Sequence, residues 1–412
     1  MVNDKGTFRI AVRKFDAFEA AMQQFWDKYC INSGCTLTLE MVIMDLPELH
    51  EATLINKGLA KGDFDIAHIN TDWIVEGSRA GAFEELNAYI QQQPPVDFPD
   101  AWSKSLLTLQ QIEGKILGLP FHDGPECLIY RKDLFENELE KKMFQEYHGI
   151  PLTVPRTWEE FHQVAQFFNR PADNLYGSVF ACFPDGHNAV FDFCLQLWNR
   201  GGSLLNEEGN IAIDSMAAIE GLTYYRKLLK DLNAVHPKSP GYDSVEAGLA
   251  FARGEAAMMI NWFGFAAMCD TDQASPVKGK VGVTLVPASQ GYHSASLNVY
   301  WLYTIGSGSK HKQIAYDFIR FATSAENDKL LTLAGGIGCR ISSWRDEEVN
   351  AVIPYFHELE QLHLHAKTLP QLHNWPAIAA IIDNTVTKAL TTTIPAVLLL
   401  QEAQEQIKTI NL

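Results

Sequence analysis

The start of the chain alternates between two hydrophobic patterns. Apolar side chains at every second position in residues 8–12 have the period of a strand, and apolar side chains at steps of three and four in residues 15–29 predict one face of a helix. Residues 37–41 alternate again, a helical stretch follows Pro47, and residues 64–69 (FDIAHI) predict a third strand. This β-α-β-α-β order predicts a parallel sheet with helices on its faces.

The middle of the chain has mainly helical patterns. A helix is expected from T-W-E-E-F, where Thr157 and Glu160 form a capping box, and Asp214 is expected to cap a later helix. The apolar run AAMMIN (256–261) predicts a short buried strand. Two further strands and one helix are expected in the last third of the chain: 281–287, 299–305 and about 311–333.

The composition is that of a globular protein large enough for more than one core. The chain has 412 residues, of which 47% are hydrophobic and 20% are charged. Lys and Arg number 33 against 50 Asp and Glu, so the net charge is −17, which makes nucleic acid and anionic membranes poor partners. No repeat or low-complexity linker is visible, so we expect two α/β lobes with several crossings between them.

Neither membrane nor export signals stand out. The longest uncharged apolar stretch, 256–269, is shorter than the roughly 20 residues that a bilayer span needs. The first residues, MVNDKGT, lack the basic start and apolar core of a signal peptide, so the sequence fits a cytoplasmic protein or a mature chain whose leader has been removed. Seven cysteines form no C-x-x-C pair and no zinc-ligand spacing; we expect most to be buried small apolar residues, a usage that favours a reducing compartment.

Polar and aromatic side chains follow several of the predicted strands. Ligands of parallel α/β sheets bind beyond the carboxyl ends of the strands, so these positions are candidates for a binding site. Carboxylates accept two hydroxyl hydrogen bonds, and an aromatic face packs on the C-H side of a sugar ring. The set therefore suits a sugar, and comprises Arg13, Lys14, Phe15, Asp72, Trp73 and Trp262.

Six segments in a defined order resemble one protein family over nearly the whole chain. They are FDIAHINTDWIVEGSRAGAFEEL (64–86), GKILGLP followed by LIYRKDLF (114–135), TWEEF (157–161), FARGEAAMMINW (251–262), GVTLVP (282–287) and AYDFIRFATSAEN (315–327). Together they resemble the extracellular solute-binding proteins of carbohydrate ABC importers, family 1, the group that includes maltose-binding protein.

The resemblance implies a two-lobed periplasmic-binding-protein fold of type II. Each lobe would be a mostly parallel sheet flanked by helices, joined by a hinge of about three crossings. On the family pattern, the N-terminal lobe takes residues 1–122 and 287–335, and the C-terminal lobe takes 123–286 and 336–412. A sugar would be captured in the interlobe cleft by hinge bending and delivered to a membrane permease.

The same resemblance implies a transport protein rather than an enzyme. We expect no cofactor and no metal, a carbohydrate ligand, ABC permease subunits as partners, and a monomer. The location would be periplasmic, or extracellular with a lipid anchor, the leader being absent from this sequence.

Further site residues come from the first crossing and from later segments. Gly124 and Pro125 in H-D-G-P-E suit a hinge, which would place neighbouring polar side chains at the floor of the cleft. Trp375 resembles the aromatic that the family supplies from its late helical segment. The additional candidates are His122, Asp123, Glu126, Asp185, His187, Trp301, Arg340 and Trp375. Their basic members make an acidic sugar an option beside a neutral mono- or oligosaccharide.

Several of these residues have structural alternatives. Trp262 suits a core aromatic, Asp72 a helix cap, and the loop around Asp185 a solvated turn. A metal or another small solute is an alternative ligand, because His357, Glu358, His363 and His365 lie close in sequence, although not at a recognised spacing. Asp123 and Glu126 would be the pair of a glycoside-active enzyme, which the intervening Gly124 and Pro125 disfavour.

Overall fold

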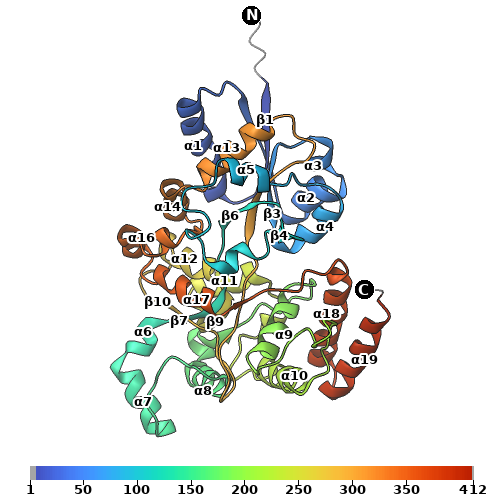
Figure 1. Ribbon diagram of the computed structural model, residues 1–412. Coiled ribbons are helices and arrows are strands. Elements are labelled where there is room, and N and C mark those ends of the chain that lie inside the picture. The colour runs from blue at the N-terminus through green and yellow to red at the C-terminus, as the bar shows by residue number, and fades with distance from the viewer. Residues whose placement is uncertain (1–5, 411–412) are drawn as a thin grey trace, which may run out of the picture. The chain divides into compact units, whose positions relative to one another are not determined.

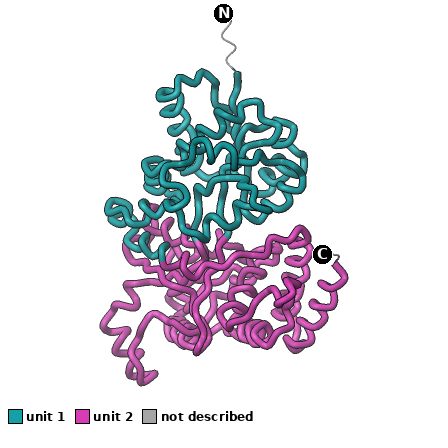
Figure 2. The backbone as a smooth tube through the Cα atoms, viewed as in Figure 1, with its two compact units in different colours: residues 1–124, 299–360 teal, residues 125–298, 361–412 magenta. Residues whose placement is uncertain are grey.

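The computed structural model describes residues 6–410 and divides the chain into two compact units (Figure 2). Unit 1 comprises residues 1–124 and 299–360, and unit 2 comprises residues 125–298 and 361–412. The prediction about a signal peptide or removed leader concerns the start of the chain, and residues 1–5 lie outside the described residues. The chain therefore crosses between the units after residues 124, 298 and 360, where the sequence had suggested 122, 286 and 335.

Unit 1 contains a five-stranded sheet in the order β2-β1-β3-β12-β6, of which β1, β3 and β6 are labelled in Figure 1. β1 is parallel to β2 and β3, whereas β12 is antiparallel to both of its neighbours, β3 and β6. The strands of the unit are β1 (Thr7–Arg13), β2 (Thr38–Met44), β3 (Ile66–Asn70), β6 (Leu119–His122) and β12 (Trp301–Ile305), with a small separate pair, β4 (Gln111–Ile112) and β5 (Lys115–Ile116). The expected β-α-β-α-β start is confirmed.

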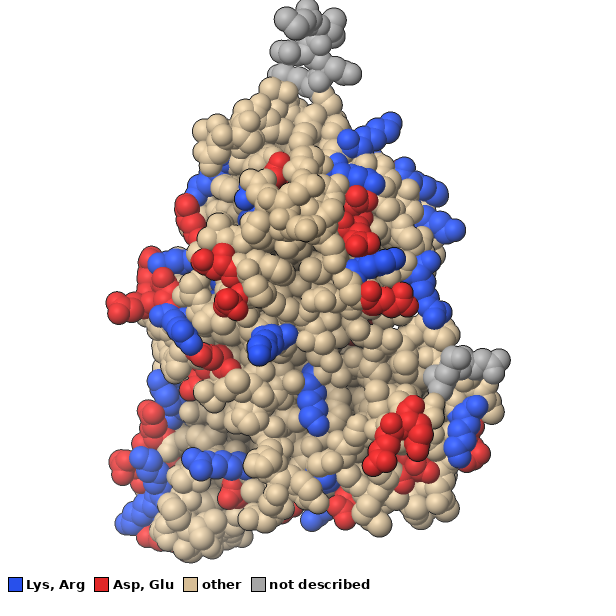
Figure 3. Space-filling view, viewed as in Figure 1, with Lys and Arg blue, Asp and Glu red and all other residues tan. Residues whose placement is uncertain are grey.

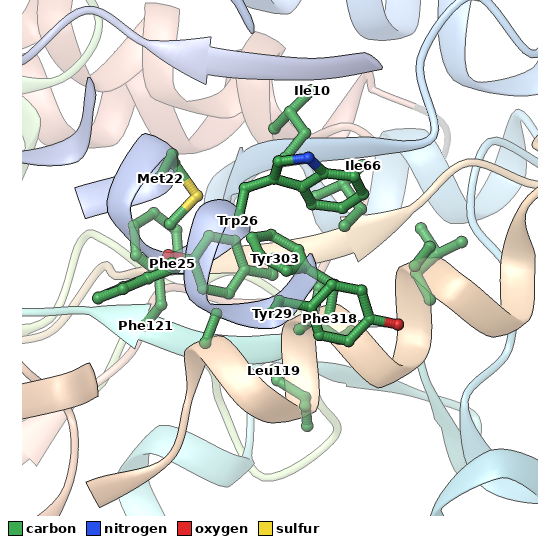
Figure 4. Packing of buried hydrophobic residues seen from close by; sticks show 14 of the residues in the cluster. Ile10, Met22, Phe25, Trp26, Tyr29, Ile66, Leu119, Phe121, Tyr303 and Phe318 are labelled. Carbon is green, nitrogen blue, oxygen red and sulfur yellow. The ribbon is translucent and has the colours of Figure 1, made fainter. Parts of the chain in front are cut away.

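Helices cover this sheet, and its core is aromatic. The helices are α1 (Asp16–Ser33), α2 (Leu46–His50), α3 (Gly58–Lys61), α4 (Ile74–Arg79), α5 (Asn87–Gln92), α13 (Lys312–Ala322), α14 (Ala325–Leu333), α15 (Ile341–Trp344) and α16 (Glu347–Val352). Shorter turns are η1 (Glu51–Ile55), η2 (Thr71–Trp73), η3 (Lys104–Leu107) and η6 (Phe356–Glu358). The apolar face of α1 packs on the sheet and on α13, and Trp26 stacks on Phe8 with ring centroids 4.6 Å apart. Trp26 also meets Phe318 of α13 at 5.2 Å (Figure 4).

Unit 2 contains a four-stranded sheet in the order β10-β7-β9-β8. β7 runs antiparallel to both of its neighbours, and β8 is parallel to β9. The strands are β7 (Glu126–Arg131), β8 (Tyr176–Val179), β9 (Ala256–Trp262) and β10 (Val281–Thr284), and a short separate pair consists of β11 (Ser296–Leu297) and β13 (Ala366–Lys367). Because β10, β11 and their partners belong to unit 2, the second crossing falls after residue 298 rather than after 286.

The helices of unit 2 cover the sheet and form a bundle beside it. They are α6 (Lys132–Glu136), α7 (Glu138–His148), α8 (Trp158–Phe168), α9 (Asn188–Trp198), α10 (Met216–Leu229), α11 (Ser244–Ala252), α12 (Phe263–Thr271), α18 (Trp375–Thr391) and α19 (Ala396–Lys408), with the turns η4 (Pro171–Asp173) and η5 (Ser239–Gly241). α17 (Leu359–Leu364) contains the third crossing. α9 packs on α10 and α18, and α19 packs on α10 and α18.

Three expectations about helix ends can be compared with the structure. The capping box of Thr157 and Glu160 at α8 is confirmed. Asp214 is not the cap of α10; Ser215 is, because its hydroxyl accepts the N-H of Ala218. The single helix expected over 311–333 was wrong, since α13 ends at Ala322 and Ser324 caps a new helix, α14.

One strand in each sheet runs against the others, and in both cases it is a strand that the chain enters just after a crossing. β7 begins after the crossing at residue 124, and β12 begins after the crossing at residue 298. The first residue of each reversed strand therefore lies at the edge where its neighbours end. This topology assembles the candidate site residues.

Three features of the sequence can be compared with the structure: the charged side chains, the apolar stretches and the cysteines. On the face drawn in Figure 3, basic side chains lie among acidic ones in both units. Within residues 6–410, no helix combines the length and the apolar character that crossing a bilayer requires. All seven cysteines are free thiols, and five of them are buried, as expected for small apolar residues.

Candidate functional site

In unit 1, candidate residues gather at the edge of the sheet where β1, β3 and β6 end. The Cα register pairs Trp301, the first residue of β12, with Asn70 at the end of β3 and with His122 at the end of β6. Arg13 ends β1, the other neighbour of β3. Four strands thus bring polar and aromatic side chains to one edge, which we call the unit 1 edge: Arg13, Asn70, His122 and Trp301, with Trp73 in the turn after β3.

The aromatic part of the unit 1 edge consists of two tryptophans. Trp73 and Trp301 lie edge to face, with ring centroids 5.9 Å apart. The His50 ring lies 4.8 Å from Trp73, and its Nε2 is 2.8 Å from Glu76. Both tryptophans are half-buried, whereas Tyr300 and Tyr303, which lie near Trp301 in sequence, are fully buried.

The turn after β3 is capped by Asn70 and not by Asp72. The Asn70 side-chain oxygen accepts the backbone N-H of Asp72 at 2.9 Å. The suggestion that Asp72 serves as the cap of the following helix is therefore not supported, and its half-buried carboxylate remains a candidate for ligand contact.

Two histidines lie at the unit 1 edge: His68 is fully buried and His122 is half-buried. Burial lowers the pKa of His122 to about 4 and the pKa of His68 to about 3. His122 Nδ1 accepts the Ile337 N-H at 2.9 Å, and His68 Nδ1 accepts the Arg13 N-H at 3.4 Å. Both rings are therefore neutral near neutral pH, so His122 does not supply the positive charge that an acidic sugar would need. Sequence reasoning missed His68, which lies inside β3.

The residues after β1 remain at the surface. Phe15 is 42% exposed and meets Phe18 edge to face at 4.9 Å. Lys14 is exposed and donates its backbone N-H to the Met44 carbonyl, and the Arg13 guanidinium donates to the Lys14 carbonyl at 3.2 Å. Arg13 and Lys14 are thus the positive charges of the unit 1 edge.

The first crossing starts from this edge. Asp123 is buried, and its N-H donates to the Ile337 carbonyl at 3.0 Å. Gly124 follows with φ 143°, a backbone conformation open to glycine but strained for other residues. Asp123 belongs to unit 1 and Glu126 to unit 2.

Arg340 occupies a structural position within unit 1. Its side chain is 2% exposed, lies over the Trp102 ring at 4.7 Å, and donates to the carbonyls of Thr323 and Val96 at 3.0 Å each. Its N-H also donates to the Asp328 carboxylate. Because these contacts engage the guanidinium, Arg340 fits a packing role better than the ligand-contacting role expected from the sequence.

In unit 2, the corresponding edge lies where β9 ends and β7 begins. The Cα register pairs Glu126, the first residue of β7, with Trp262, the last residue of β9. The Trp262 ring meets the Phe191 ring of α9 edge to face at 5.7 Å. We call this group the unit 2 edge: Glu126, Phe191 and Trp262. Trp262 is half-buried, which leaves part of its ring accessible.

The loop before α9 is organised by Asp185. One carboxylate oxygen accepts the N-H groups of His187 and Asn188, at 2.8 and 2.9 Å, and the other accepts the Asn188 side-chain N-H at 2.6 Å. This fits the turn-forming alternative for Asp185. His187 lies 5.7 Å from Phe191, which places its ring next to the unit 2 edge.

The start of α18 supplies an aromatic and an amide. Trp375 is the first residue of α18 and is almost fully buried, as is Asn374 before it. Neither side-chain oxygen nor nitrogen of Asn374 has a hydrogen-bond partner among residues 6–410. Buried amides normally have partners, so Asn374 is a candidate that sequence reasoning missed.

Two carboxyl groups lie close to the unit 2 edge. Glu126 comes from β7, and Asp192, which sequence reasoning also missed, follows Phe191 in α9. Burial, with the charge of Asp192 as a second cause, raises the pKa of Glu126 well above its usual range. Burial also raises the pKa of Asp192 to about 7, although the hydroxyl of Tyr225 donates to its Oδ2.

The histidine-rich stretch near the third crossing does not form a metal site. Within residues 6–410, no group of three or more His, Cys, Asp or Glu side chains is placed to hold a metal ion. His357 contacts the Asn350 side chain at 3.0 Å, and His365 contacts the Ser294 carbonyl at 3.0 Å. These contacts disfavour the metal-binding alternative.

Comparison with known proteins gives a consistent result. The family model described as bacterial extracellular solute-binding protein matches residues 49–329. A probable ABC transporter-binding protein of Deinococcus radiodurans is 25% identical over 322 residues, which cover 76% of this chain and 71% of the relative. The structure of maltose-bound T. maritima MalE3 has a TM-score of 0.83 at 22% identity and covers 98% of this chain and 100% of that one. An ABC transporter solute-binding protein of Agrobacterium radiobacter, in complex with ribitol, has a TM-score of 0.82 at 25% identity, with 99% of each chain covered.

Proposed function

Because the chain belongs to the family of bacterial extracellular solute-binding proteins, we propose that it binds a sugar or polyol and delivers it to the permease of an ABC importer. The observation that carries the proposal is that aromatic rings lie next to polar side chains at the unit 1 edge and also at the unit 2 edge. At the unit 2 edge, Trp262 is the register partner of Glu126. At the unit 1 edge, Trp301 lies against Trp73.

This combination suits polyhydroxylated molecules. Aromatic rings pack on the C-H side of a sugar, and carboxyl and amide groups hydrogen-bond its hydroxyls. Maltose and ribitol, the ligands of the two similar structures, share this chemistry although one is a disaccharide and the other a linear polyol. We propose that the remaining candidates at the edges contact the ligand: Arg13, Lys14, Phe15, Asp72, His122, Asp123, His187 and Trp375.

The experiment is a binding screen by thermal shift, followed by calorimetry. The panel contains neutral sugars, acidic sugars, amino sugars and linear polyols. A ligand present at 100 times its Kd stabilises the native state by about 2.7 kcal/mol, which raises the melting temperature measurably. If no compound of the panel raises the melting temperature and a divalent metal ion does, the metal-binding alternative replaces this proposal.

Binding without turnover is the activity we propose. The family consists of solute-binding proteins, and the candidate carboxyl pair Asp123 and Glu126 is divided between the units. A chromogenic glycoside incubated with the protein should release no chromophore. Release that disappears on changing Glu126 to Gln would instead establish a glycoside-active enzyme.

Location and assembly follow from the same proposal. The family is extracellular, so we propose that a monomer acts in the periplasm or, held by a lipid anchor, at the outer cell surface. A leader encoded upstream of Val2 and permease genes beside the coding region would support export. Sedimentation analysis measures the monomeric state, and a stable dimer would refute it.

A further inference from the structure

A buried carboxyl group at the unit 2 edge lacks a hydrogen-bond partner. Glu126 is 6% exposed, and its Oε2 atom has no partner among residues 6–410. A buried polar atom without a partner destabilises a folded protein, so such atoms commonly mark functional positions. Glu126 is also the register partner of Trp262, which places it beside the aromatic surface described above.

A second buried carboxyl group belongs to the same region. Asp192 is 7% exposed and directly follows Phe191, whose ring meets Trp262. Its Oδ2 accepts the Tyr225 hydroxyl, which is also 3.3 Å from the Cys182 sulfur. The charge of Asp192 contributes to the raised pKa of Glu126, so the two carboxyl groups interact electrostatically.

The titratable groups that interact electrostatically with this pair are acids, and the His187 ring lies 5.7 Å from the neighbouring Phe191 ring. The acids come from β7, α9, α10 and the segment after β8: Cys127, Cys194, Tyr225 and Cys182. Among the described residues, no Lys, Arg or His is a cause of the shifted pKa of either carboxyl group. Buried carboxylates usually lie next to a cation, and a bound ligand can supply one to this pair.

We propose that Glu126 and Asp192 bind the ammonium group of an aminated sugar or polyol, while its carbon skeleton packs on Trp262 and Phe191. This inference rests on the proposed function and narrows its ligand class. An ammonium group would donate a hydrogen bond to Oε2 and reduce the repulsion between the two carboxylates. The adjacent aromatic rings favour the same charge through cation-π attraction.

Proton release distinguishes this ligand from a neutral one. Burial raises the pKa of Glu126 well above its usual range and brings the pKa of Asp192 to about 7. An ammonium group favours both carboxylates in their ionised form, so its binding should release protons to the buffer. A neutral hydroxyl can bind the protonated carboxyl group directly and should release almost none.

The test uses the full chain and matched ligands. Calorimetry compares glucose, glucosamine and N-acetylglucosamine, and equivalent sets built on galactose and on glucitol, in buffers of different ionisation enthalpy. In at least one set, the amino compound should bind at least about tenfold more tightly than its neutral parent and should release protons on binding. The N-acetylated compound should lose this gain in affinity.

Two variants assign the effect to the carboxyl pair. Glu126→Gln keeps the size of the side chain and should remove the advantage of the amino ligand and its proton release, while the native melting transition is retained. Glu207→Gln, an exposed position in the same unit, should change neither. Asp192→Asn should reproduce the loss if Glu126→Gln fails to fold.

The outcomes separate this inference from the proposed function. Binding of neutral members as tight as that of their amino partners would overturn the inference and leave sugar binding standing. An amino advantage that persists in Glu126→Gln and Asp192→Asn would also overturn it. Failure of every set, neutral and amino alike, would refute sugar binding itself and with it the inference.

Discussion

Trp301 and Trp73 meet edge to face at the unit 1 edge, with their ring centroids 5.9 Å apart and an angle of 80° between the ring planes. Trp301 begins β12 and Trp73 ends the turn after β3, so residues far apart in sequence form one aromatic surface. The register of β12 against β3, which pairs Trp301 with Asn70, fixes this contact. Such pairs contribute about 0.5–1.5 kcal/mol beyond the burial of apolar area.

Replacing either tryptophan by Ala should weaken sugar binding by about tenfold or more, because each ring supplies part of the surface that packs on the ligand. In a double-mutant cycle, the Trp73→Ala and Trp301→Ala changes should show a coupling of about 0.5–1.5 kcal/mol in the free energy of unfolding. Denaturant unfolding and calorimetry measure both quantities. Ile55→Ala, an exposed position in unit 1, is the control. Unchanged binding in both single variants would refute the role of this edge.

Trp262→Ala should weaken sugar binding by about tenfold or more and leave the fold intact, because the ring is half-buried and its neighbour Phe191 remains. Calorimetry gives the affinity, and circular dichroism with thermal melting checks the fold. Tyr147→Ala removes a ring that is 81% exposed on α7 of the same unit, and should have no effect on binding. Loss of folding without a selective loss of binding would support the alternative that Trp262 is a core residue.

The sequence allowed the order of elements and part of each edge to be predicted. The rule that ligands bind beyond the carboxyl ends of strands led to Arg13, Trp73 and Trp262, because each follows an apolar run of clear strand period. The rule does not cover Glu126 and Trp301, which begin the reversed strands β7 and β12. Their place at the edges depends on strand pairing, which no local pattern encodes.

Other residues depended on contacts between distant segments. Asp192 lies in an apolar helical pattern, and its partner Tyr225 comes from α10. Asn374 differs from any exposed amide only through its burial. Arg340 was expected at the ligand as one of the basic residues that suggested an acidic sugar, but its carbonyl partners, Thr323 and Val96, belong to segments that the sequence does not connect to it.

Acidification should destabilise the protein through His122. Its pKa is lowered from 6.5 to about 4 in the folded state, so the unfolded chain binds more protons between these values. The stabilising effect of the neutral ring is therefore complete above about pH 6.5 and is lost as the pH falls toward 4. Each unit of pKa difference corresponds to about 1.4 kcal/mol.

The variant His122→Asn isolates this contribution. Its side-chain oxygen can accept the Ile337 N-H in place of Nδ1, but it does not titrate. The decrease in unfolding free energy between pH 6.5 and 4, measured by urea unfolding, should be smaller in the variant than in the original protein. Glu126 and Asp192 have raised pKa values, so their effect on the unfolding free energy has the opposite pH dependence. Because both proteins contain these two residues, the difference between the pH profiles of the variant and the original protein reports on His122 alone. Identical pH profiles would contradict a neutral His122 ring in the folded state.

Arg340→Met should destabilise unit 1 without changing ligand affinity. The guanidinium donates to the Thr323 and Val96 carbonyls, and Met keeps much of the apolar stem on Trp102 but donates nothing. Each buried carbonyl left without its donor costs about 1–3 kcal/mol, so the urea midpoint should fall clearly. Arg345→Met, which removes an exposed pair with Glu360, should have a much smaller effect. If Arg340→Met instead lost affinity by about tenfold at an unchanged urea midpoint, Arg340 would return to the ligand-binding residues that the sequence suggested.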